Sequence, residues 1–277
     1  MLYLVGTPIG NLGDISPRAC EILSSVDLVA CEDTRRTGLL LSNLNISNKL
    51  FSYHEHNKAA KGNVLIGMLK EGLDIALVSD AGMPSVSDPG EDLVSLCISE
   101  DIPVSVIPGP VAAITALVLS GLDTRRYHFE GFLPSENKPR KERLLKLKSI
   151  EETIVLYEAP HRLMKLIEEL DENGFGECRV SFCRELTKKY EEVIRLKVKE
   201  ASAYFTEKAP KGEFVVCLEA LGVRPGETEM LTDEEIDAMI RELAKEGHST
   251  KEIARIVADK TQRSKKDLYN YAINLLK

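Results

Sequence analysis

The chain has 277 residues, of which 43% are hydrophobic and 29% are charged, and its glycine and proline contents are ordinary. This length predicts two domains, with or without a small appendage, and the composition excludes collagen-like and wholly disordered proteins. The formal net charge of −8 argues against a protein that coats nucleic acid over its whole surface, although local basic patches remain compatible with it.

The six cysteines never form a C-x-x-C pair, and most lie in apolar runs. We therefore expect buried, reduced thiols and no metal site. No apolar stretch reaches the ~20 residues that a membrane span requires, and the N-terminus has no charged targeting region. These features predict a cytoplasmic protein that does not interact with a membrane.

Strand-like runs alternate with helical patterns in the first part of the chain. Ser16 and Pro17 are typical of a helix N-terminus, with a capping serine followed by proline at the first helical position. Alternation of strand and helix predicts a mostly parallel sheet covered on both faces, in a first α/β domain over residues 1–121. The strands are expected at Leu2–Val5, Asp27–Cys31, Asp74–Val78 and Pro103–Ile107, and the helices at Pro17–Ser25, Thr34–Asn43, Asn63–Lys70, Glu91–Ser99 and Val111–Ser120.

A second set of elements predicts another α/β domain over residues 122–222. The segment between the two sets of elements, Leu133–Lys148, is basic, with six Lys/Arg against two Glu. Strands are expected at Thr153–Tyr157, Arg179–Arg184, Glu192–Val198 and Glu213–Leu218, and helices at Arg140–Ser149 and Pro160–Asn173.

The pattern changes after Gly222. Val223–Met230 contains a Pro-Gly breaker and predicts a linker, and three helical patterns without a strand follow it. Residues 223–277 are therefore expected to form a small helix-turn-helix-like extension. Its last part, Lys251–Lys277, has seven Lys/Arg against three Asp/Glu, which favours an RNA-binding role; a solvated helical tail is the alternative.

Loops that follow strands are where ligands bind in an open α/β sheet. Gly6–Asp14 is glycine-rich but is neither G-x-G-x-x-G nor a P-loop, so neither a dinucleotide nor a nucleoside triphosphate is indicated. Val78–Gly90, with two Pro, two Gly and three Ser, predicts a stiff turn that exposes backbone groups. A ligand site and a purely structural turn both fit this pattern.

Nine motifs, in order, carry a resemblance to a known family: GTPIGNLGD, CEDTRRTG, SYHEHN, SDAGMPSVSDPG, IPGP, GFLP, YEAPHR, CRELTKKYEE and KGEFVV. The chain resembles the tetrapyrrole-methylase-like (class III) S-adenosylmethionine (SAM) methyltransferases. Within that family it is similar to the branch that methylates the ribose 2′-oxygen of a cytidine in the 16S rRNA of the small (30S) ribosomal subunit. The resemblance covers essentially the whole chain.

The resemblance implies two α/β lobes with SAM in the cleft between them, and a homodimer. It also implies cofactor contacts from both lobes. These would be Pro8, Asp80, Ala81, Gly82, Met83, Pro84, Ala112, Leu156, Tyr157, Ala159, Pro210, Lys211 and Gly212.

Methyl transfer to a ribose hydroxyl needs no metal but benefits from a group that accepts the hydroxyl proton. We expect Asp33, His54 and Glu55 to be the catalytic, substrate-facing residues. Other candidates for the base are Glu32, His56, Asp88, Glu158 and His161. The alternatives are that Asp33 only caps the following helix and that the histidine is simply hydrated.

Phosphate contacts are expected from basic residues in these motifs and in the two basic segments. They are Arg35, Arg36, Arg140, Lys141, Arg162, Lys265 and Lys266. Arg162 has an alternative role, an ion pair with Glu158 one helical turn away.

Two other functions remain open. Relatives with this fold methylate corrin precursors or make diphthamide intermediates, but they are not expected to carry the terminal helices or the basic segment. A regulator that senses SAM and binds nucleic acid would keep the helices and would not consume SAM.

Overall fold

The computed structural model describes residues 1–221, 233–245, 247–261 and 264–276. These residues divide into two compact units, one of residues 1–144 and 152–219 and the other of residues 145–151 and 220–277, and each unit is described by itself. The linker predicted at Val223–Met230 lies outside the described residues.

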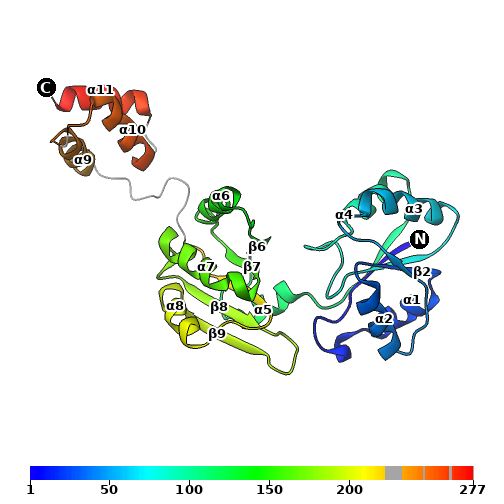
Figure 1. Cartoon of the computed structure of the whole chain (residues 1–277). Helices are drawn as coiled ribbons and strands as arrows, with labels where there is room; N and C mark the ends of the chain where they lie inside the picture. Colours follow the sequence, from blue (N-terminus) through cyan, green and yellow to red (C-terminus); the bar gives the residue numbers. More distant parts are fainter. Residues whose placement is uncertain (222–232, 246, 262–263, 277) are drawn as a thin grey trace. The chain divides into compact units, whose positions relative to one another are not determined.

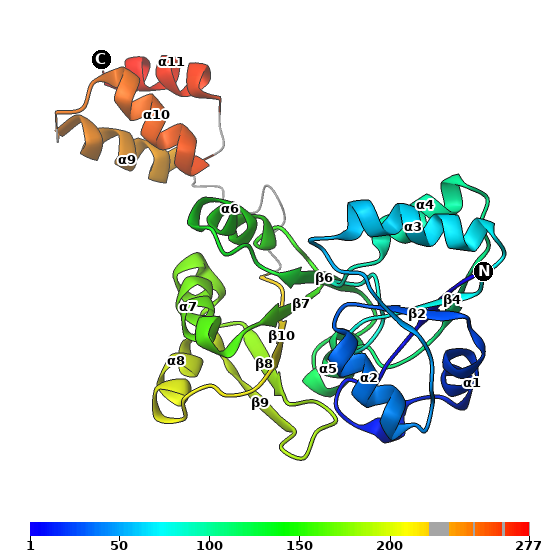
Figure 2. The same cartoon turned by 45° about the vertical axis from the view of Figure 1, so that its right-hand side comes forward.

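The first lobe of the larger unit is a parallel five-stranded sheet in the order β3-β2-β4-β1-β5. Its strands are β1 (Leu2–Val5), β2 (Leu28–Cys31), β3 (Leu50–Ser52), β4 (Ile75–Val78) and β5 (Val104–Ile107). Its helices are α1 (Pro17–Ser25), α2 (Thr34–Asn43), α3 (Lys58–Lys70) and α4 (Glu91–Ser99). Figure 2 shows α1 and α2 on one face of the sheet and α3 and α4 on the other, which confirms the predicted parallel sheet covered on both faces.

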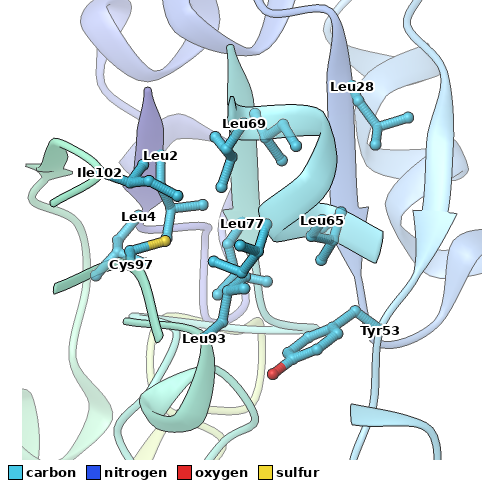
Figure 3. Close-up of a cluster of buried hydrophobic side chains, with 13 residues drawn as sticks. Leu2, Leu4, Leu28, Tyr53, Leu65, Leu69, Leu77, Leu93, Cys97 and Ile102 are labelled. Atoms are coloured by element: carbon cyan, nitrogen blue, oxygen red, sulfur yellow. The ribbon is translucent and has the colours of Figure 1, made fainter. Parts of the chain in front are cut away.

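The core between the sheet and α3/α4 is built from alternating strand positions. Leu2 and Leu4 of β1 point into it together with Leu77 of β4, and they meet Leu65 of α3 and Leu93 of α4 (Figure 3). Intervening residues of the strands, such as Val5 and Val78, fill the layer under α1 and α2 instead. Because β2 and β4 are buried on both faces, these two strands are apolar at every position, as parallel strands usually are.

The second lobe is a mixed sheet in the order β6-β7-β10-β8-β9. The pair β6–β7 is parallel, whereas β10 is antiparallel to β7 and β8, and β9 is antiparallel to β8. The strands are β6 (Tyr127–Phe132), β7 (Thr153–Glu158), β8 (Arg179–Arg184), β9 (Glu192–Lys197) and β10 (Phe214–Leu218). The helices are α6 (Asn137–Leu147), α7 (Pro160–Leu170) and α8 (Val198–Glu207).

Helix α5 (Ala112–Ser120) packs on the second sheet, although it follows β5, a strand of the first sheet, in the chain (Figure 1). Ala113, Ala116 and Leu117 pack against Val155 of β7 and Cys217 of β10. The helix therefore ties the two lobes into one compact unit. The domain boundaries at residues 121 and 222 stay predictions.

In the other unit, the described residues from 233 onward form three helices: α9 (Asp233–Lys245), α10 (Thr250–Thr261) and α11 (Lys265–Leu275). Their shared core contains Ile236, Ile240, Ile253, Val257 and Leu268. The helical periodicity of the sequence thus predicted this small core correctly.

Candidate functional site

A cavity of about 380 Å³ lies within the larger unit, and both lobes contribute to its walls. Most of its lining is apolar, and a few polar groups interrupt that lining, as is usual for sites that bind small molecules. The first lobe and α5 contribute Ile9, Asp80, Ala81, Gly82, Met83, Val86, Ser87, Asp88, Val111 and Ala112; the second lobe contributes Phe132, Tyr157, Glu158, Ala159, Pro160, Cys183, Leu186, Glu213, Phe214 and Val215.

The loop after β4 forms much of the first-lobe wall. It is fastened to the loop after β1, because Thr7 N–H donates to the Gly82 carbonyl at 2.9 Å and Gly82 N–H donates to the Thr7 carbonyl at 3.1 Å. Ser85 and Ser87 both have positive φ angles, 70° and 60°, which are costly for residues with a Cβ. Backbone strain of this kind is concentrated at functional sites, and here the strained loop lines the cavity.

Close backbone packing supports the same wall. A Cβ atom on Gly6 would lie 2.6 Å from Gly109 Cα, so the loops after β1 and β5 touch through their main chains. Only glycine at these two positions allows this approach.

Two carboxylates face the cavity from the loop after β4. Asp80 accepts hydrogen bonds from the Asp33 N–H at 3.2 Å and from Arg36 Nη1 at 3.0 Å. Asp88 has no such cationic partner among the described residues. Burial, reinforced by repulsion from Glu32 and Asp80, raises the pKa of Asp88 to about 6, so this carboxyl group is a stronger base than an ordinary aspartate.

Asp33 is the N-cap of α2, as the alternative interpretation proposed. Its Oδ1 accepts from Arg35 N–H at 2.8 Å, and its Oδ2 lies 2.7 Å from Arg35 Nη2. Hydrogen bonds from the Arg35 side chain and backbone hold the pKa of Asp33 well below its usual range. A carboxylate stabilised in this way is a poor proton acceptor.

His54 and Glu55 follow β3 and, like Asp33, are absent from the lining of the cavity among the described residues. The Glu55 carboxylate pairs with Lys58 at 2.9 Å and is mostly exposed. Nδ1 of His54 is buried and has no hydrogen-bond partner in the described part of the chain. The structure thus leaves the predicted catalytic roles of Asp33, His54 and Glu55 as predictions, and it brings Asp88 into the cavity instead.

The predicted cofactor contacts divide into two groups. Asp80, Ala81, Gly82, Met83, Ala112, Tyr157 and Ala159 line the cavity, whereas Pro8, Pro84, Leu156, Pro210, Lys211 and Gly212 do not. Leu156 is fully buried on the opposite face of its strand from Val155 and Tyr157, because successive side chains of a strand alternate. Pro210 and Lys211 line a second, separate cavity.

Several residues that line the cavity belong to the quoted motifs but were not among the predicted cofactor contacts. Phe132 belongs to GFLP, Leu186 to CREL, and Phe214 and Val215 to KGEFVV. The motifs thus marked the correct segments. The motifs did not show which side chains of each segment face the cavity, because that depends on how the strands pair.

Arg140 is buried rather than available to RNA, so its predicted role as a phosphate contact is corrected. Its side chain is 1% exposed, Nη2 lies 3.2 Å from Glu158 Oε2, and Nε lies 2.6 Å from Glu169 Oε2. Arg162 Nε lies 3.2 Å from the other Glu158 oxygen, and Arg162 Nη2 donates to the Leu133 carbonyl at 2.7 Å. These four side chains join α6, β7 and α7 directly behind the cavity wall at Glu158.

The other predicted RNA contacts are solvent-accessible. The side chains of Arg35 and Arg36 are 89% and 71% exposed, although both pair with aspartates. Lys141, Lys265 and Lys266 are exposed. Their contact with RNA stays a prediction.

Two features are absent from the described residues, a metal-binding group of side chains and a membrane-spanning helix. No group of His, Cys, Asp or Glu side chains suited to a metal ion occurs among them. No described helix is both long enough and apolar enough to cross a bilayer.

Comparisons with known proteins bear on the whole chain. Residues 1–202 match the family model of tetrapyrrole (corrin/porphyrin) methylases, and residues 231–276 match the RsmI C-terminal HTH domain. A ribosomal RNA small subunit methyltransferase I from Synechocystis is 45% identical, with 99% of this chain and 98% of the relative covered. A protein of the same name from Vibrio cholerae is 42% identical, with 100% and 95% covered.

A solved structure shows the same fold. The uroporphyrin-III-C-methyltransferase of Thermus thermophilus superposes with a TM-score of 0.57 over 78% of this chain and 93% of its own, at 22% identity.

Proposed function

Because the chain belongs to the tetrapyrrole (corrin/porphyrin) methylase family, we propose that it transfers a methyl group from SAM to the ribose 2′-hydroxyl of a cytidine in 16S rRNA. The observation that carries this proposal is the near-complete match, at 45% and 42% identity, to two small-subunit rRNA methyltransferases. A protein with this substrate would act in the cytoplasm, and we propose that it does so as a homodimer on the 30S subunit.

The residues of the main cavity fit SAM as cofactor. Met83, Phe132 and Tyr157 offer apolar and aromatic surface, while Asp80 and Asp88 offer acceptors for hydroxyl or ammonium groups. Ser85 belongs to the loop after β4, and its buried hydroxyl has no hydrogen-bond partner among the described residues. We propose that the predicted contacts lining the cavity hold SAM, which supplies an electrophilic methyl group on its sulfonium.

Asp88 is the proposed acceptor of the ribose proton. Its carboxylate faces the cavity, and its raised pKa of about 6 lies nearer to neutral pH than that of the capped Asp33. General bases work best when their pKa lies near the operating pH, and such a group typically contributes ~10²–10⁴-fold to the rate. Correct orientation of the nucleophile contributes further.

The proposal is tested by methyl transfer from methyl-labelled SAM to 30S subunits prepared from cells that lack the gene. We expect label in 16S rRNA at the ribose of one cytidine, located by nuclease digestion and mass spectrometry. Lys49 is exposed and does not line the cavity, so the Lys49→Ala variant should transfer methyl groups as wild type does and serves as the active control. Binding of SAM without any methyl transfer to RNA would favour a sensor and would refute the proposal.

A further inference from the structure

A second cavity, of about 320 Å³, opens on the other face of the second sheet. Cys183 of β8 lines the main cavity, and the next residue, Arg184, lines this one, because neighbouring side chains of a strand point to opposite faces. Phe214, at the start of β10, contributes to both. The two cavities are therefore separated by the same sheet and share one aromatic side chain.

The second cavity combines cations with aromatic rings. Its cations are Arg184, Lys208 and Lys211, and its only carboxylate is that of Glu192, 3.4 Å from Arg184 Nη1. Lys208 Nζ lies 4.9 Å from the centre of the Tyr204 ring. We call the surface formed by Arg184, Tyr204, Lys208 and Lys211 the rear groove.

The two lysines of the rear groove are not neutralised. Both are exposed, and neither forms an ion pair with a described residue, whereas Lys188 nearby pairs with two carboxylates. Within the described part of the chain, the one hydrogen bond from the Lys208 ammonium goes to the Tyr204 hydroxyl, at 3.3 Å. On a chain with a net charge of −8, such a pair of free cations creates a local positive surface.

An exposed aromatic ring flanks the groove. Arg184 Nη1 donates to the Tyr190 carbonyl at 3.5 Å, and Tyr190 itself is 64% exposed, with Lys189 Nζ 5.5 Å from its ring centre. A large exposed ring beside free lysines is typical of surfaces on which unpaired bases stack while their phosphates meet cations.

We propose that the rear groove, with Tyr190 at its edge, binds a single-stranded segment of the rRNA substrate. Lys208 and Lys211 would contact its phosphates, and Tyr190 would stack on a base. This inference rests on the proposed function and adds an RNA contact surface on the face of the sheet opposite the cavity for the methyl donor. The nucleotides bound there would anchor the substrate without taking part in methyl transfer.

The test compares the Lys208→Ala/Lys211→Ala variant with wild type in 30S binding at several salt concentrations. The logarithm of the binding constant falls as the logarithm of the salt concentration rises. Each lost phosphate contact makes this slope less steep by about 0.7 to 0.9, so the slope of the double variant should be less steep by about 1.5. We expect the KM for 30S subunits to rise roughly tenfold, whereas the kcat at saturation and the affinity for SAM stay unchanged. The Lys49→Ala/Lys70→Ala variant removes the same charge from the first lobe and should behave as wild type.

Tyr190 is tested separately by a matched pair of variants. Tyr190→Ala should weaken 30S binding by about tenfold, because the stacking of one base is lost, and Tyr190→Phe, which keeps the ring, should retain wild-type binding. Ultraviolet cross-linking should place an RNA nucleotide on the peptide that contains Tyr190.

Two results would overturn the inference. An unchanged salt slope and KM in the lysine variant would remove the phosphate contact, and cross-links from this surface to a ribosomal protein instead of RNA would identify a different partner. Both comparisons presuppose a wild-type protein that methylates 30S rRNA. Failure of that reaction would refute the proposed function instead.

Discussion

The buried ion pair between Arg140 and Glu158 allows a quantitative prediction about the cavity wall. Both side chains are 1% exposed, and they join α6 to the end of β7, where Glu158 also accepts from the Ala159 N–H at 3.0 Å. Replacing Arg140 with Met leaves a buried carboxylate with one remaining cationic partner, Arg162.

Removal of one partner from a buried pair typically costs about 3 to 5 kcal/mol of unfolding free energy. We expect a loss near the lower end, about 3 kcal/mol, because Arg162 still compensates Glu158. The double variant Arg140→Met/Glu158→Gln removes both fully buried charges, and only the partly exposed Glu169 and Arg162 lose a partner, so it should recover at least about 1 kcal/mol of that loss. Affinity for SAM should remain weakened in both variants, since the link between α6 and the turn at Glu158–Pro160 is gone.

Stability is measured by urea unfolding followed by far-ultraviolet circular dichroism, because the chain contains no Trp. SAM binding is measured by calorimetry in the same buffer. A single variant within about 0.5 kcal/mol of wild type would refute the energetic reasoning. A double variant that binds SAM with wild-type affinity would show that the pair stabilises the fold without positioning the cavity wall.

Three further predictions concern Asp88, Gly6 and Asp33. The folded-state pKa of Asp88, about 6, lies above its ordinary value, so the contribution of Asp88 to the stability of wild type should fall by roughly 2 kcal/mol as the pH rises from about 4 to about 6. The Asp88→Asn variant should show no such loss in pH-dependent unfolding and should have a kcat at least about 100-fold lower. Gly6→Ala should cost about 1 to 3 kcal/mol because its methyl group would collide with Gly109, whereas Gly67→Ala, with nothing within 4 Å, should cost nothing in thermal unfolding. Asp33→Asn keeps a good helix cap and should retain wild-type stability and a kcat within a few-fold of wild type; a loss of about 100-fold would restore Asp33 as the base.

Local sequence patterns were sufficient for much of the architecture. The Ser16-Pro17 cap, the apolar strand runs and the terminal helical periodicity predicted elements that the structure confirms, because caps and periodicities depend on neighbouring residues alone. The predictions did not include β3, which has only three residues, or β6 and α8.

The tertiary structure decided which residues of each motif face the cavity. Val155 and Tyr157 point to α5 while Leu156 is buried on the other face, and this orientation depends on the register of β7 with β10. Arg140 lies in a basic stretch that reads as an RNA surface, yet its partners Glu158 and Glu169 come from later elements and bury it. Likewise, the raised pKa of Asp88 depends on burial and on Glu32 and Asp80, which only folding brings near. Local chemistry thus identified the loops that matter, whereas charge compensation, burial and strand register, which depend on residues distant in the chain, assigned their individual roles.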